Sequence, residues 1–499
     1  MSLCRVDFCE PWPLFGVAAT RRIEQAAMAQ LAPHALMQRA GLAVARLALA
    51  LAPHSRTIWI ACGPGNNGGD GFEAAMHLAQ WGKHPVVTWL GDEARLPADA
   101  RAALQRARQA GVTLQDEPPP VEPGDLVVDA LLGIGSSRPP EGQMRDWLIR
   151  MNSGPAPVLA VDLPSGLDAD TGGYALDSIA EADHFTGDSG IFHAKKHTLS
   201  LLTLKPGLFT AHGRDAAGCV WFDDLDCNAG AEPSTAELLG TPASVARPHA
   251  SHKGTFGDVA VIGGARGMGG AVLLAGSAAL NSGAGKVFVA PLDGGAMTLD
   301  QTQPELMFRS PNAIDLESST VVCGCGGGDT VATVLPDVLL RSKQLVLDAD
   351  ALNAIAADPA LQQALLERGE RGQPTVLTPH PLEAARLVGT DAKQIQADRL
   401  GAAQRLADRF CCTVVLKGSG TVIAARGRCP AFNPTGNAKL ATAGTGDVLA
   451  GMIGAGLAAR GSAWDAACAA VYRHGMAADR WPNDEALTAG RLAKNRLRR

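Results

Sequence analysis

The sequence has few aromatic residues and no long apolar run. Aromatics make up 4% of its 499 residues, with only two tyrosines, so the apolar mass is aliphatic. No stretch reaches the ~18 uninterrupted apolar residues that a membrane span requires. The start, MSLCRVDFCEPWP, contains acidic residues and no apolar h-region, which argues against a signal peptide. We therefore expect a cytoplasmic protein without a membrane partner.

A surplus of basic residues is also missing. The formal net charge is −6, which argues against a general nucleic-acid-binding surface, and the basic end at 491–499 is expected to be a solvated tail. The eleven cysteines form no CxxC pair, so neither a zinc site nor a disulfide framework is indicated. Reduced thiols are the expected state.

The chain does contain a long alternation of short β-rich runs and helical segments. Its length suggests two to four domains. The alternation predicts two α/β domains with parallel sheets, at 1–226 and 247–499, joined by a linker of small polar residues at 227–246. Residues 1–55 are expected to be helical. Strands are expected at 57–62, 84–90, 125–133, 156–166, 198–204 and 217–222, and then at 258–264, 286–290, 319–324, 344–349, 374–378 and 412–418.

A glycine-rich segment, GPGNNGGDG at 63–71, follows the first predicted strand. Its glycines allow close backbone approach to a ligand, and a helix beginning near Asp70 would offer free amides to a phosphate. The segment is not a GxGxxG motif with a distant acid, which disfavours an ordinary Rossmann cofactor site. A tight turn with a capping aspartate is the alternative.

Polar residues also follow other strands of the first half. Asp129 and Asp162 each end a predicted strand, and Ser165 follows closely. Ligands of open parallel sheets bind outside the carboxyl ends of the strands. Together with Asn67, these residues indicate one pocket with hard oxygen donors, suited to a monovalent cation.

The second half carries another ordered set of motifs. GTGD at 444–447 precedes an apolar helix, so its amides can form an anion hole while Asp447 deprotonates a hydroxyl that attacks a phosphoryl group. The alternatives are a helix cap for Asp447, a solvated lysine at Lys417 and a turn histidine held by prolines at His380. The other motifs are HKGTFGDVAVIGGARGMGGA (252–271), CGCGGGD (323–329), LDADALN (347–353), TPHPLE (378–383) and KGSGT (417–421).

GPGNNGGDG, VDALLGIG (128–135) and AVDLPSGLDADTG (160–172) resemble the N-terminal domain of NAD(P)H-hydrate epimerases, which have a Rossmann-like fold. The resemblance implies that Asp162 is catalytic and that Asn67, Asp129 and Ser165 hold potassium. It implies a binding site for the hydrated nicotinamide nucleotide formed by Asn66, Asn67, Gly68, Gly69, Asp70, Gly133, Ile134, Gly135, Ser136, Ser137, Arg138 and Pro139. The segment at 184–197 departs from the family and looks like an insertion.

The second half resembles the ribokinase-like superfamily and, more closely, the ADP-dependent NAD(P)H-hydrate dehydratases. The resemblance implies that Asp447 is catalytic. The hydrate site would be lined by Ala271, Gly326 and His380, and the adenine nucleotide would be held by Lys417, Gly418, Ser419, Gly420, Thr421 and Gly446. The chain departs from the family at 437–440, which read Asn-Ala-Lys-Leu, and at Leu382.

The fused pair resembles the bifunctional NAD(P)H-hydrate repair enzymes. The implied function is epimerisation of R- and S-NADHX and NADPHX, followed by dehydration of the S form with ADP to give NAD(P)H, AMP and phosphate. Potassium in the first domain and Mg²⁺ with ADP in the second are the implied cofactors, and a homo-oligomer is expected. Two alternatives remain: a ribokinase-like small-molecule kinase fused to a nucleotide-binding domain, and a first domain that binds without catalysing.

Overall fold

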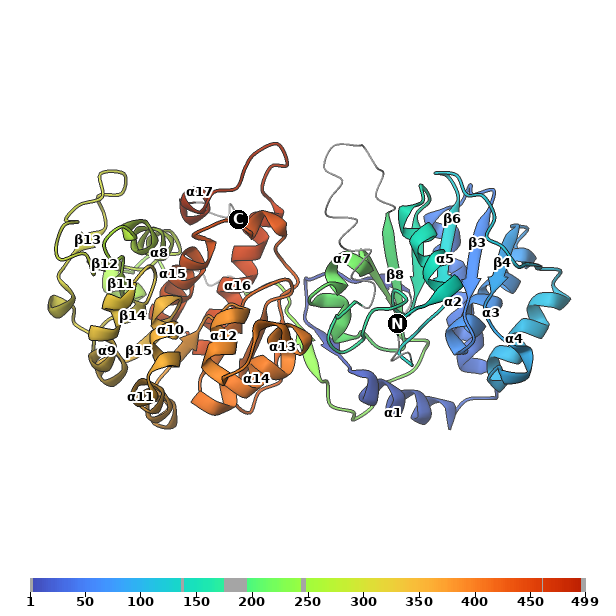
Figure 1. The fold of residues 1–499 in the computed structure, drawn as a ribbon, viewed down its shortest axis with the longest axis horizontal. Coiled ribbons are helices and arrows are strands. Elements are labelled where there is room, and N and C mark those ends of the chain that lie inside the picture. The colour runs from blue at the N-terminus through green and yellow to red at the C-terminus, as the bar shows by residue number, and fades with distance from the viewer. Residues whose placement is uncertain (1–2, 136–138, 175–194, 244–247, 460, 495–499) are drawn as a thin grey trace. The chain divides into compact units, whose positions relative to one another are not determined.

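The computed structural model describes residues 3–135, 139–174, 195–243, 248–459 and 461–494. It divides into two compact units, which are considered separately below (Figure 1). Unit 1 runs to Asp7 and then from Trp12 to Ala236, and unit 2 comprises Phe8–Pro11 and the chain from Glu237 onward. The boundary falls inside the predicted linker 227–246, at a short strand, β10 (Ala236–Leu238).

Unit 1 is built on one sheet whose described strands follow the order β1-β9-β8-β7-β6-β3-β4-β5. Neighbours are parallel except β1, which is antiparallel to β9. The strands are β1 (Cys4–Arg5), β3 (Ile58–Cys62), β4 (Pro85–Trp89), β5 (Thr113–Gln115), β6 (Leu126–Ala130), β7 (Val158–Val161), β8 (Lys196–Leu201) and β9 (Cys219–Asp223). A further short strand, β2 (Trp12–Leu14), bridges to Leu204.

Helices cover both faces of this sheet. Along β3, Ile58 and Ile60 pack into the core beneath α2, α3 and α4, while Trp59 and Ala61 pack on the other side against α5. This alternation is expected for a strand buried on both faces, and it produces three layers. The helices of the unit are α1 (Val17–Met28), α2 (Ala35–Leu51), α3 (Asn66–Gln80), α4 (Ala98–Gln109), α5 (Gly142–Ser153) and α7 (Gly213–Ala217).

Two local predictions for unit 1 are wrong. Residues 1–55 are not helical throughout, because β1 and β2 precede α1, and both depend on partners far along the chain. Helix α3 begins at Asn66, four residues before Asp70. The glycines of that turn serve helix packing: a Cβ on Gly68 would lie 2.1 Å from the carbonyl oxygen of Gly63, and one on Gly69 2.7 Å from Cε of Met37.

Unit 2 has a second, mostly parallel sheet. Its described strands follow the order β13-β12-β11-β14-β15-β16-β17-β18-β19-β10, with β18 antiparallel to both neighbours. The strands other than β10 are β11 (Asp258–Gly263), β12 (Lys286–Pro291), β13 (Met307–Phe308), β14 (Thr320–Cys323), β15 (Gln344–Leu347), β16 (Thr375–Leu377), β17 (Thr413–Leu416), β18 (Val422–Ala425) and β19 (Ala431–Phe432).

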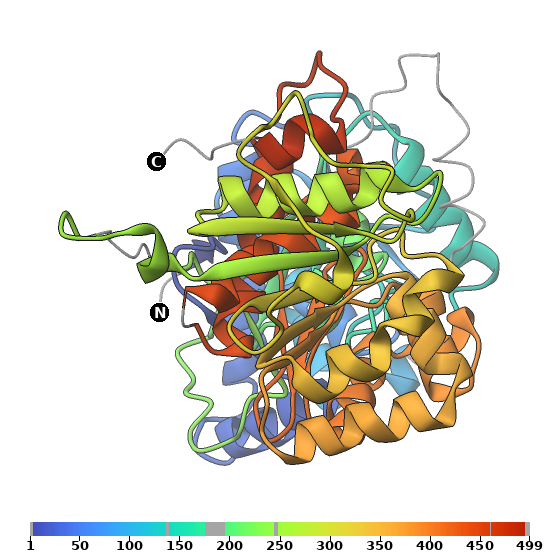
Figure 2. The same cartoon turned by 90° about the vertical axis from the view of Figure 1, so that its left-hand side faces the viewer.

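The helices of unit 2 also form two layers. On one face α8, α15 and α16 pack against the sheet, with α17 beside α8; on the other lie α9 to α14 (Figure 2). The expected two-domain α/β fold class is confirmed. The helices are α8 (Gly269–Asn281), α9 (Leu335–Arg341), α10 (Asp350–Ala357), α11 (Pro359–Glu370), α12 (Pro381–Val388), α13 (Ala392–Ala397), α14 (Arg399–Phe410), α15 (Thr445–Ala458), α16 (Ala463–Asp479) and α17 (Ala489–Lys494).

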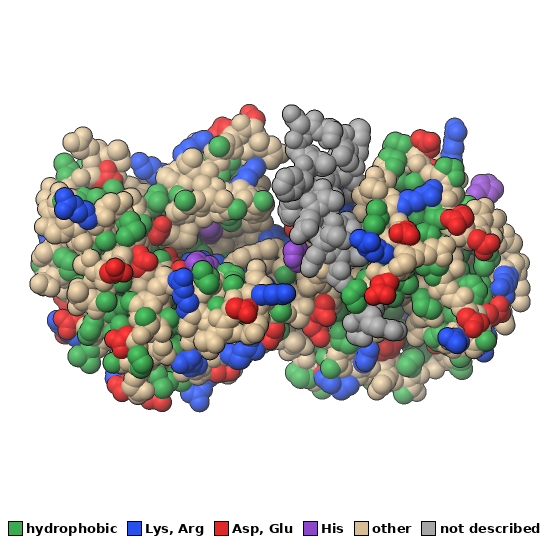
Figure 3. Space-filling model, in the orientation of Figure 1, with side chains coloured by type: hydrophobic (Ala, Val, Ile, Leu, Met, Phe, Trp, Pro, Cys, Tyr) green, Lys and Arg blue, Asp and Glu red, His purple; other side chains and the backbone are tan. Residues whose placement is uncertain are grey.

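The surface charges and the state of the cysteines can be compared with the expectations drawn from the composition. Acidic and basic side chains are interspersed over the described part of the face drawn in Figure 3. All eleven cysteines are free thiols. Within the described ranges, no helix has the length and apolar character needed to cross a bilayer.

Candidate active sites in the two units

A cavity of about 580 Å³ opens at the carboxyl ends of β3, β6 and β7 in unit 1. The N-terminal turn of α3 forms one wall, and the chain that leaves β6 forms another. Predicted site residues that line the cavity are Asn66, Asn67, Asp70, Gly133, Ile134, Gly135 and Asp162. Gly68, Gly69 and Pro139 do not line it, and Ser136, Ser137 and Arg138 lie outside the described residues.

Asp162 is held rigidly at this cavity. It follows β7 directly with a positive φ of 67°, a backbone conformation that non-glycine residues rarely adopt. Its carboxylate forms an ion pair with the buried ammonium of Lys205 and accepts a hydrogen bond of 3.2 Å from the amide of Leu201. Lys205 also donates to the carbonyl oxygen of Leu201 at 2.7 Å. A carboxylate and an ammonium therefore meet at the cavity wall, an arrangement able to accept and return a proton.

Asp129 and Ser165 form a second buried group beside this cavity. The Ser165 hydroxyl donates to one oxygen of Asp129 at 2.6 Å, and its amide donates to the other at 2.9 Å. Burial raises the pKa of Asp129, and no lysine or arginine of the described residues forms an ion pair with it. The Asn67 side chain lies against Gly133, the loop residue after β6: a Cβ added to Gly133 would lie 3.2 Å from Oδ1 of Asn67. The Asn67 amide nitrogen is buried without a hydrogen-bond partner.

Further carboxylates surround the unit 1 cavity. Burial, followed by the charges of Asp162 and Glu24, raises the pKa of Asp70 well above its usual value. Burial and Asp162 likewise raise the pKa of Glu24. Asp99 at the start of α4 contacts Nδ1 of His34 at 2.5 Å. Carboxyl groups thus predominate on the cavity wall, beside Arg21 and Lys205, and they offer hydrogen-bond partners for hydroxyl groups.

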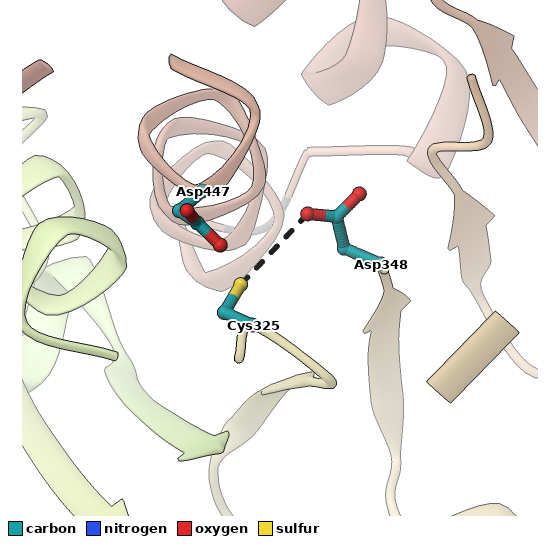
Figure 4. A group of neighbouring side chains, drawn as sticks. All are labelled: Cys325, Asp348 and Asp447. Atoms are coloured by element: carbon teal, nitrogen blue, oxygen red, sulfur yellow. Dashed lines mark hydrogen bonds between the residues drawn. The ribbon is translucent and has the colours of Figure 1, made fainter. Parts of the chain in front are cut away.

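In unit 2, four neighbouring strands bring polar residues together at their carboxyl ends. Asp348 follows β15, and one of its oxygens accepts 2.7 Å hydrogen bonds from Lys417, which follows β17, and from Thr378, which follows β16. Cys325, after β14, donates from Sγ to the other oxygen at 3.9 Å (Figure 4). Lys417 lies in this buried cluster, so it is not a solvated strand-end lysine.

Asp447 approaches the same cluster from the first turn of α15. Gly444 supplies the turn with a φ of 89°, and no side chain caps the helix, so Asp447 does not act as its cap. A Cβ on Gly446 would lie 3.5 Å from Nζ of Lys417. Burial and the charge of Asp348 raise the pKa of Asp447 to about 6, against smaller effects of Cys325 and Lys417.

The other ionisable groups of the cluster have defined states. Burial would lower the pKa of Lys417, but Asp348 and Glu383 raise it, so the ammonium stays charged. Burial and the two aspartates raise the pKa of Cys325, which keeps the thiol protonated. Burial raises the pKa of Glu383 to about 6. His474, buried against the carbonyl oxygen of Thr445 at 3.0 Å, has its pKa lowered by burial to about 4.

His380 is both a helix cap and a neighbour of this cluster. Its Nδ1 accepts from the amides of Leu382 and Glu383 at 3.1 and 3.3 Å, capping α12. Its Nε2 lies 3.2 Å from Glu383, which in turn is 3.9 Å from Lys417. Burial and the charge of Lys417 lower the pKa of His380, so its imidazole is neutral at pH 7.

The remaining predicted residues of unit 2 form two groups. Ala271 in α8 lies against Gly326, whose added Cβ would come within 2.8 Å of the Ala271 methyl. The segment 417–421 is the turn between β17 and β18, and Thr421 donates to the carbonyl oxygen of Gly418 at 3.1 Å. Gly418 and Ser419 are exposed, as a ligand-binding turn requires.

Comparisons with known proteins identify the family. Residues 259–498 match the family described as NAD(P)H-hydrate dehydratase, and residues 33–207 match the YjeF-related protein N-terminus. The bifunctional NAD(P)H-hydrate repair enzyme Nnr of Escherichia coli is 38% identical over 91% of this chain and 87% of its own length. This chain belongs to the family of bifunctional NAD(P)H-hydrate repair enzymes.

Relatives of the second half alone are also found. The ADP-dependent (S)-NAD(P)H-hydrate dehydratase of Neisseria meningitidis is 43% identical over 50% of this chain and 85% of that protein. A crystal structure of the ADP/ATP-dependent NAD(P)H-hydrate dehydratase of Bacillus subtilis is 30% identical, with a TM-score of 0.42, over 50% of this chain and 90% of that one.

Several residues of this repair-enzyme chain belong to the two clusters but were not singled out from the sequence. Asp348 lies in the LDADALN segment and follows a strand directly, which is the signal that selected Asp129 and Asp162. Glu383 ends the TPHPLE segment. Lys205 and Cys325 carry no local signal, because their roles depend on which side chains the sheet places opposite them. The expected insertion at 184–197 falls mostly outside the described residues, which resume at 195.

Proposed function

We propose that the chain repairs hydrated nicotinamide nucleotides by two reactions, one in each unit. Unit 1 interconverts R- and S-NAD(P)HX. Unit 2 transfers the terminal phosphoryl group of ADP to the hydroxyl of S-NAD(P)HX and then eliminates phosphate, giving NAD(P)H and AMP. Family membership and two polar clusters at the carboxyl ends of parallel strands support this assignment.

In unit 1, the Asp162–Lys205 pair is the proposed proton shuttle. The substrate carbon bears a hydroxyl and the ring nitrogen, so loss of either bond and re-formation on the opposite face inverts the centre. Both directions require a proton to leave and return near the same atom. A carboxylate fixed by an ammonium and by a backbone amide meets that requirement, because its position does not change between the two half-reactions.

Potassium fits the Asn67, Asp129 and Ser165 group. The donors are carboxylate, hydroxyl and amide oxygens, which suit a hard cation. A buried carboxylate without a cationic partner among the described residues supports that fit. When bound, potassium would neutralise Asp129 and fix the loop that carries Gly133. Substrate-binding roles for the N-terminal turn of α3 and for 133–139 are part of this proposal.

In unit 2, Asp447 is the proposed general base and Lys417 the proposed phosphate ligand. The observation that carries this role is their shared position. Both lie beside Asp348, and a Cβ on Gly446 in the turn that carries Asp447 would lie 3.5 Å from Nζ of Lys417. Asp447 takes the proton from the substrate hydroxyl, while the turn amides and Lys417 stabilise charge on the moving phosphoryl group. The ring nitrogen then assists loss of phosphate, a better leaving group than hydroxide, and loss of a proton from the neighbouring ring carbon restores the ring double bond.

Mg²⁺ is proposed to accompany ADP on its phosphate oxygens. Cys325, Asp348 and Asp447 each place one ligand atom within 4.8 Å of the others. This trio suits Mg²⁺ poorly, since Mg²⁺ prefers oxygen ligands, Cys325 is a protonated thiol and Asp348 is already paired with Lys417. The adenine nucleotide is proposed to contact the turn at 417–421 and Gly446. The hydrate is proposed to contact Ala271, Gly326 and His380.

A product assay tests the dehydratase half against the kinase alternative. Purified protein receives S-NADHX and ADP, and NADH absorbance, AMP and inorganic phosphate are followed together. The proposal requires one AMP and one phosphate per NADH. A stable phosphorylated product without NADH would identify a small-molecule kinase and overturn the proposal.

Each activity is further proposed to belong to its own unit. Fragments divided at the 236/237 boundary, with Phe8–Pro11 retained as a separate peptide for the second, are the natural test. The first fragment should epimerise NADHX and the second should dehydrate only its S form. A cytoplasmic location and a homo-oligomer remain predictions, the latter to be tested by light scattering.

A further inference from the structure

A second large cavity lies in unit 2, apart from the Asp348–Asp447 cluster. It has a volume of about 1000 Å³ and extends along one face of α8, which supplies Gly270, Leu273, Leu274 and Ser277 at helical spacing. The segment 300–303 and the chain from Arg480 to Lys494 form its other walls. The volume is at the upper end of the range for small-molecule sites. None of these residues has a role in the function proposed above.

The walls of this cavity carry positive charge. Arg480, Arg491 and Lys494 line it, opposed by Asp300. Arg491 forms an ion pair with Glu485 and packs over the Trp481 ring at 4.9 Å. Arg480 and Lys494 form no ion pair with any described residue. Both side chains are exposed, so they are free to contact an anionic ligand in the hollow, such as a phosphate group.

The same cavity contains buried polar atoms without hydrogen-bond partners. Nε1 of Trp481 and Oε1 of Gln303 are both unpartnered, and the two residues are only 7% and 8% exposed. Buried polar groups in native proteins are nearly always paired, so these two call for a partner from outside the described chain. An indole N–H donor and an amide acceptor are complementary to the edge of a nucleobase.

The cavity adjoins the proposed hydrate site. Gly270 precedes Ala271, which packs on Gly326. A Cβ on Gly444 would lie 2.6 Å from Leu274, so the cavity wall touches the turn that carries Asp447. Lys439 donates to the carbonyl oxygen of Trp481 at 3.1 Å, which ties the unusual 437–440 segment to the same wall.

The cavity also lies away from the proposed ADP turn. Helix α8 follows β11, whereas the 417–421 turn follows β17, and β14, β15 and β16 lie between those strands. Four strand spacings correspond to about 19 Å. The two adenine nucleotides of the reaction, ADP and the distal part of the dinucleotide substrate, therefore have separate places to bind.

We propose that this cavity binds the adenylate half of the NAD(P)HX dinucleotide while the hydrated ring lies at Asp447. The inference rests on the function proposed above. Arg480 and Lys494 would contact the substrate's phosphate groups, including the additional 2′-phosphate of NADPHX. Leu273 and Leu274 supply apolar surface for the base, and Trp481 and Gln303 supply its hydrogen bonds.

The test combines truncation of the protein with truncation of the substrate. The full-length double variant Arg480→Gln/Lys494→Gln is compared with the parent on S-NADHX and on the hydrate of reduced nicotinamide mononucleotide, which lacks the adenylate half. Loss of two charged contacts should raise KM for S-NADHX by about tenfold or more. KM for the truncated substrate, KM for ADP and both kcat values should stay unchanged.

Two further variants complete the design. Trp481→Phe keeps the ring under Arg491 but removes the N–H donor, and should raise KM for S-NADHX alone. Arg371→Gln removes an exposed arginine after α11, outside the cavity, and should change KM for neither substrate. Equal effects on both substrates, or an effect on ADP, would overturn the proposal. So would a change in oligomeric state by light scattering with KM unaltered, which would make the cavity an interface between copies.

Failure of this proposal is distinguishable from failure of the proposed function. If the parent protein converts both hydrates with ADP but the double variant matches it, only the adenylate site is wrong. If the parent forms no NADH from either hydrate, the proposed function itself is wrong.

Discussion

Replacing Asp447 by asparagine should remove the general base of unit 2 and leave the fold intact. Asparagine keeps the size and one oxygen of the side chain, and α15 has no side-chain cap to lose. Loss of a positioned general base typically lowers a rate by about 10²–10⁴-fold. Binding of ADP should change little, because Lys417 and the 417–421 turn would still contact its phosphates.

The dehydration rate of the parent enzyme should fall at acidic pH, and this acidic limb of the pH–rate profile should be absent from the variant. The pKa of Asp447 is raised to about 6, so the base is ionised above that pH and protonated below it. Single-turnover dehydration at saturating ADP should therefore fall as pH decreases through 6. Glu383 has a similar pKa, so the residual activity of Asp447→Asn reports whether Glu383 contributes a limb of its own.

The same raised pKa predicts the effect on stability, and its sign is opposite to the effect on rate. Between its usual value of 3.8 and about 6, the folded state binds the proton more tightly than the unfolded state, so stability falls as pH rises. At about 1.4 kcal/mol per pKa unit, ionisation of this carboxylate lowers the free energy of unfolding above pH 6 by at most roughly 3 kcal/mol. Asparagine carries no charge, so the variant should be at least as stable as the parent at pH 8.

Single-turnover rates, ADP affinity and denaturant unfolding at pH 5 and pH 8 measure these effects together. Asp337→Asn, an exposed acid in the first turn of α9, is the matched control and should alter neither rate nor pH profile. Dehydration by Asp447→Asn at near the parent rate would refute the base assignment. Unfolding of the variant at pH 8 would instead make Asp447 a structural residue.

Three other predictions address the remaining parts of the two sites. Lys205→Met should abolish most epimerisation, since it leaves Asp162 without its ion pair, while dehydration of pure S-NADHX is unchanged; equal loss of both activities would indicate misfolding instead. Exchange of potassium for a bulky organic cation should weaken hydrate binding to unit 1, measured by titration, and Asp129→Asn should abolish that cation dependence; indifference to the cation would refute the potassium site. Cys325→Ala removes a hydrogen bond that lowers the pKa of Asp447, so the acidic limb of dehydration should move to higher pH, whereas Cys323→Ala in β14 should not move it; coincident profiles would show that the thiol is inert.

The fold was largely predictable because its strands are buried on both faces and read as continuous apolar runs. Each of the twelve predicted strands overlaps an observed one: β3, β4, β6, β7, β8 and β9 in unit 1, and β11, β12, β14, β15, β16 and β17 in unit 2. Seven short strands were missed, because pieces of two to four residues carry too little periodicity: β1, β2, β5, β10, β13, β18 and β19. The start of α3 was misplaced because glycine, a poor helix former, is selected there by close packing.

The positions of some candidate residues were predictable because they stand at the carboxyl end of a strand or directly after it. Asp129, Asp162 and Lys417 could be placed at strand ends from the sequence, and the structure brings each to a polar cluster. The ion pairs between strand ends were not predictable. Asp348 and Lys417 are 69 positions apart in the sequence, and Asp162 and Lys205 are 43 apart. Those pairs depend on sheet order and on side-chain direction, which no local motif encodes.

The most direct test of the two-reaction account is the extent to which racemic NADHX is consumed with excess ADP. The account predicts that the parent converts the whole racemate to NADH, with one AMP and one phosphate per NADH, faster than enzyme-free exchange of the two forms. Asp162→Asn should convert half quickly and the rest only at that exchange rate. A parent enzyme that stops at half, or that accumulates a phosphorylated hydrate, would contradict it.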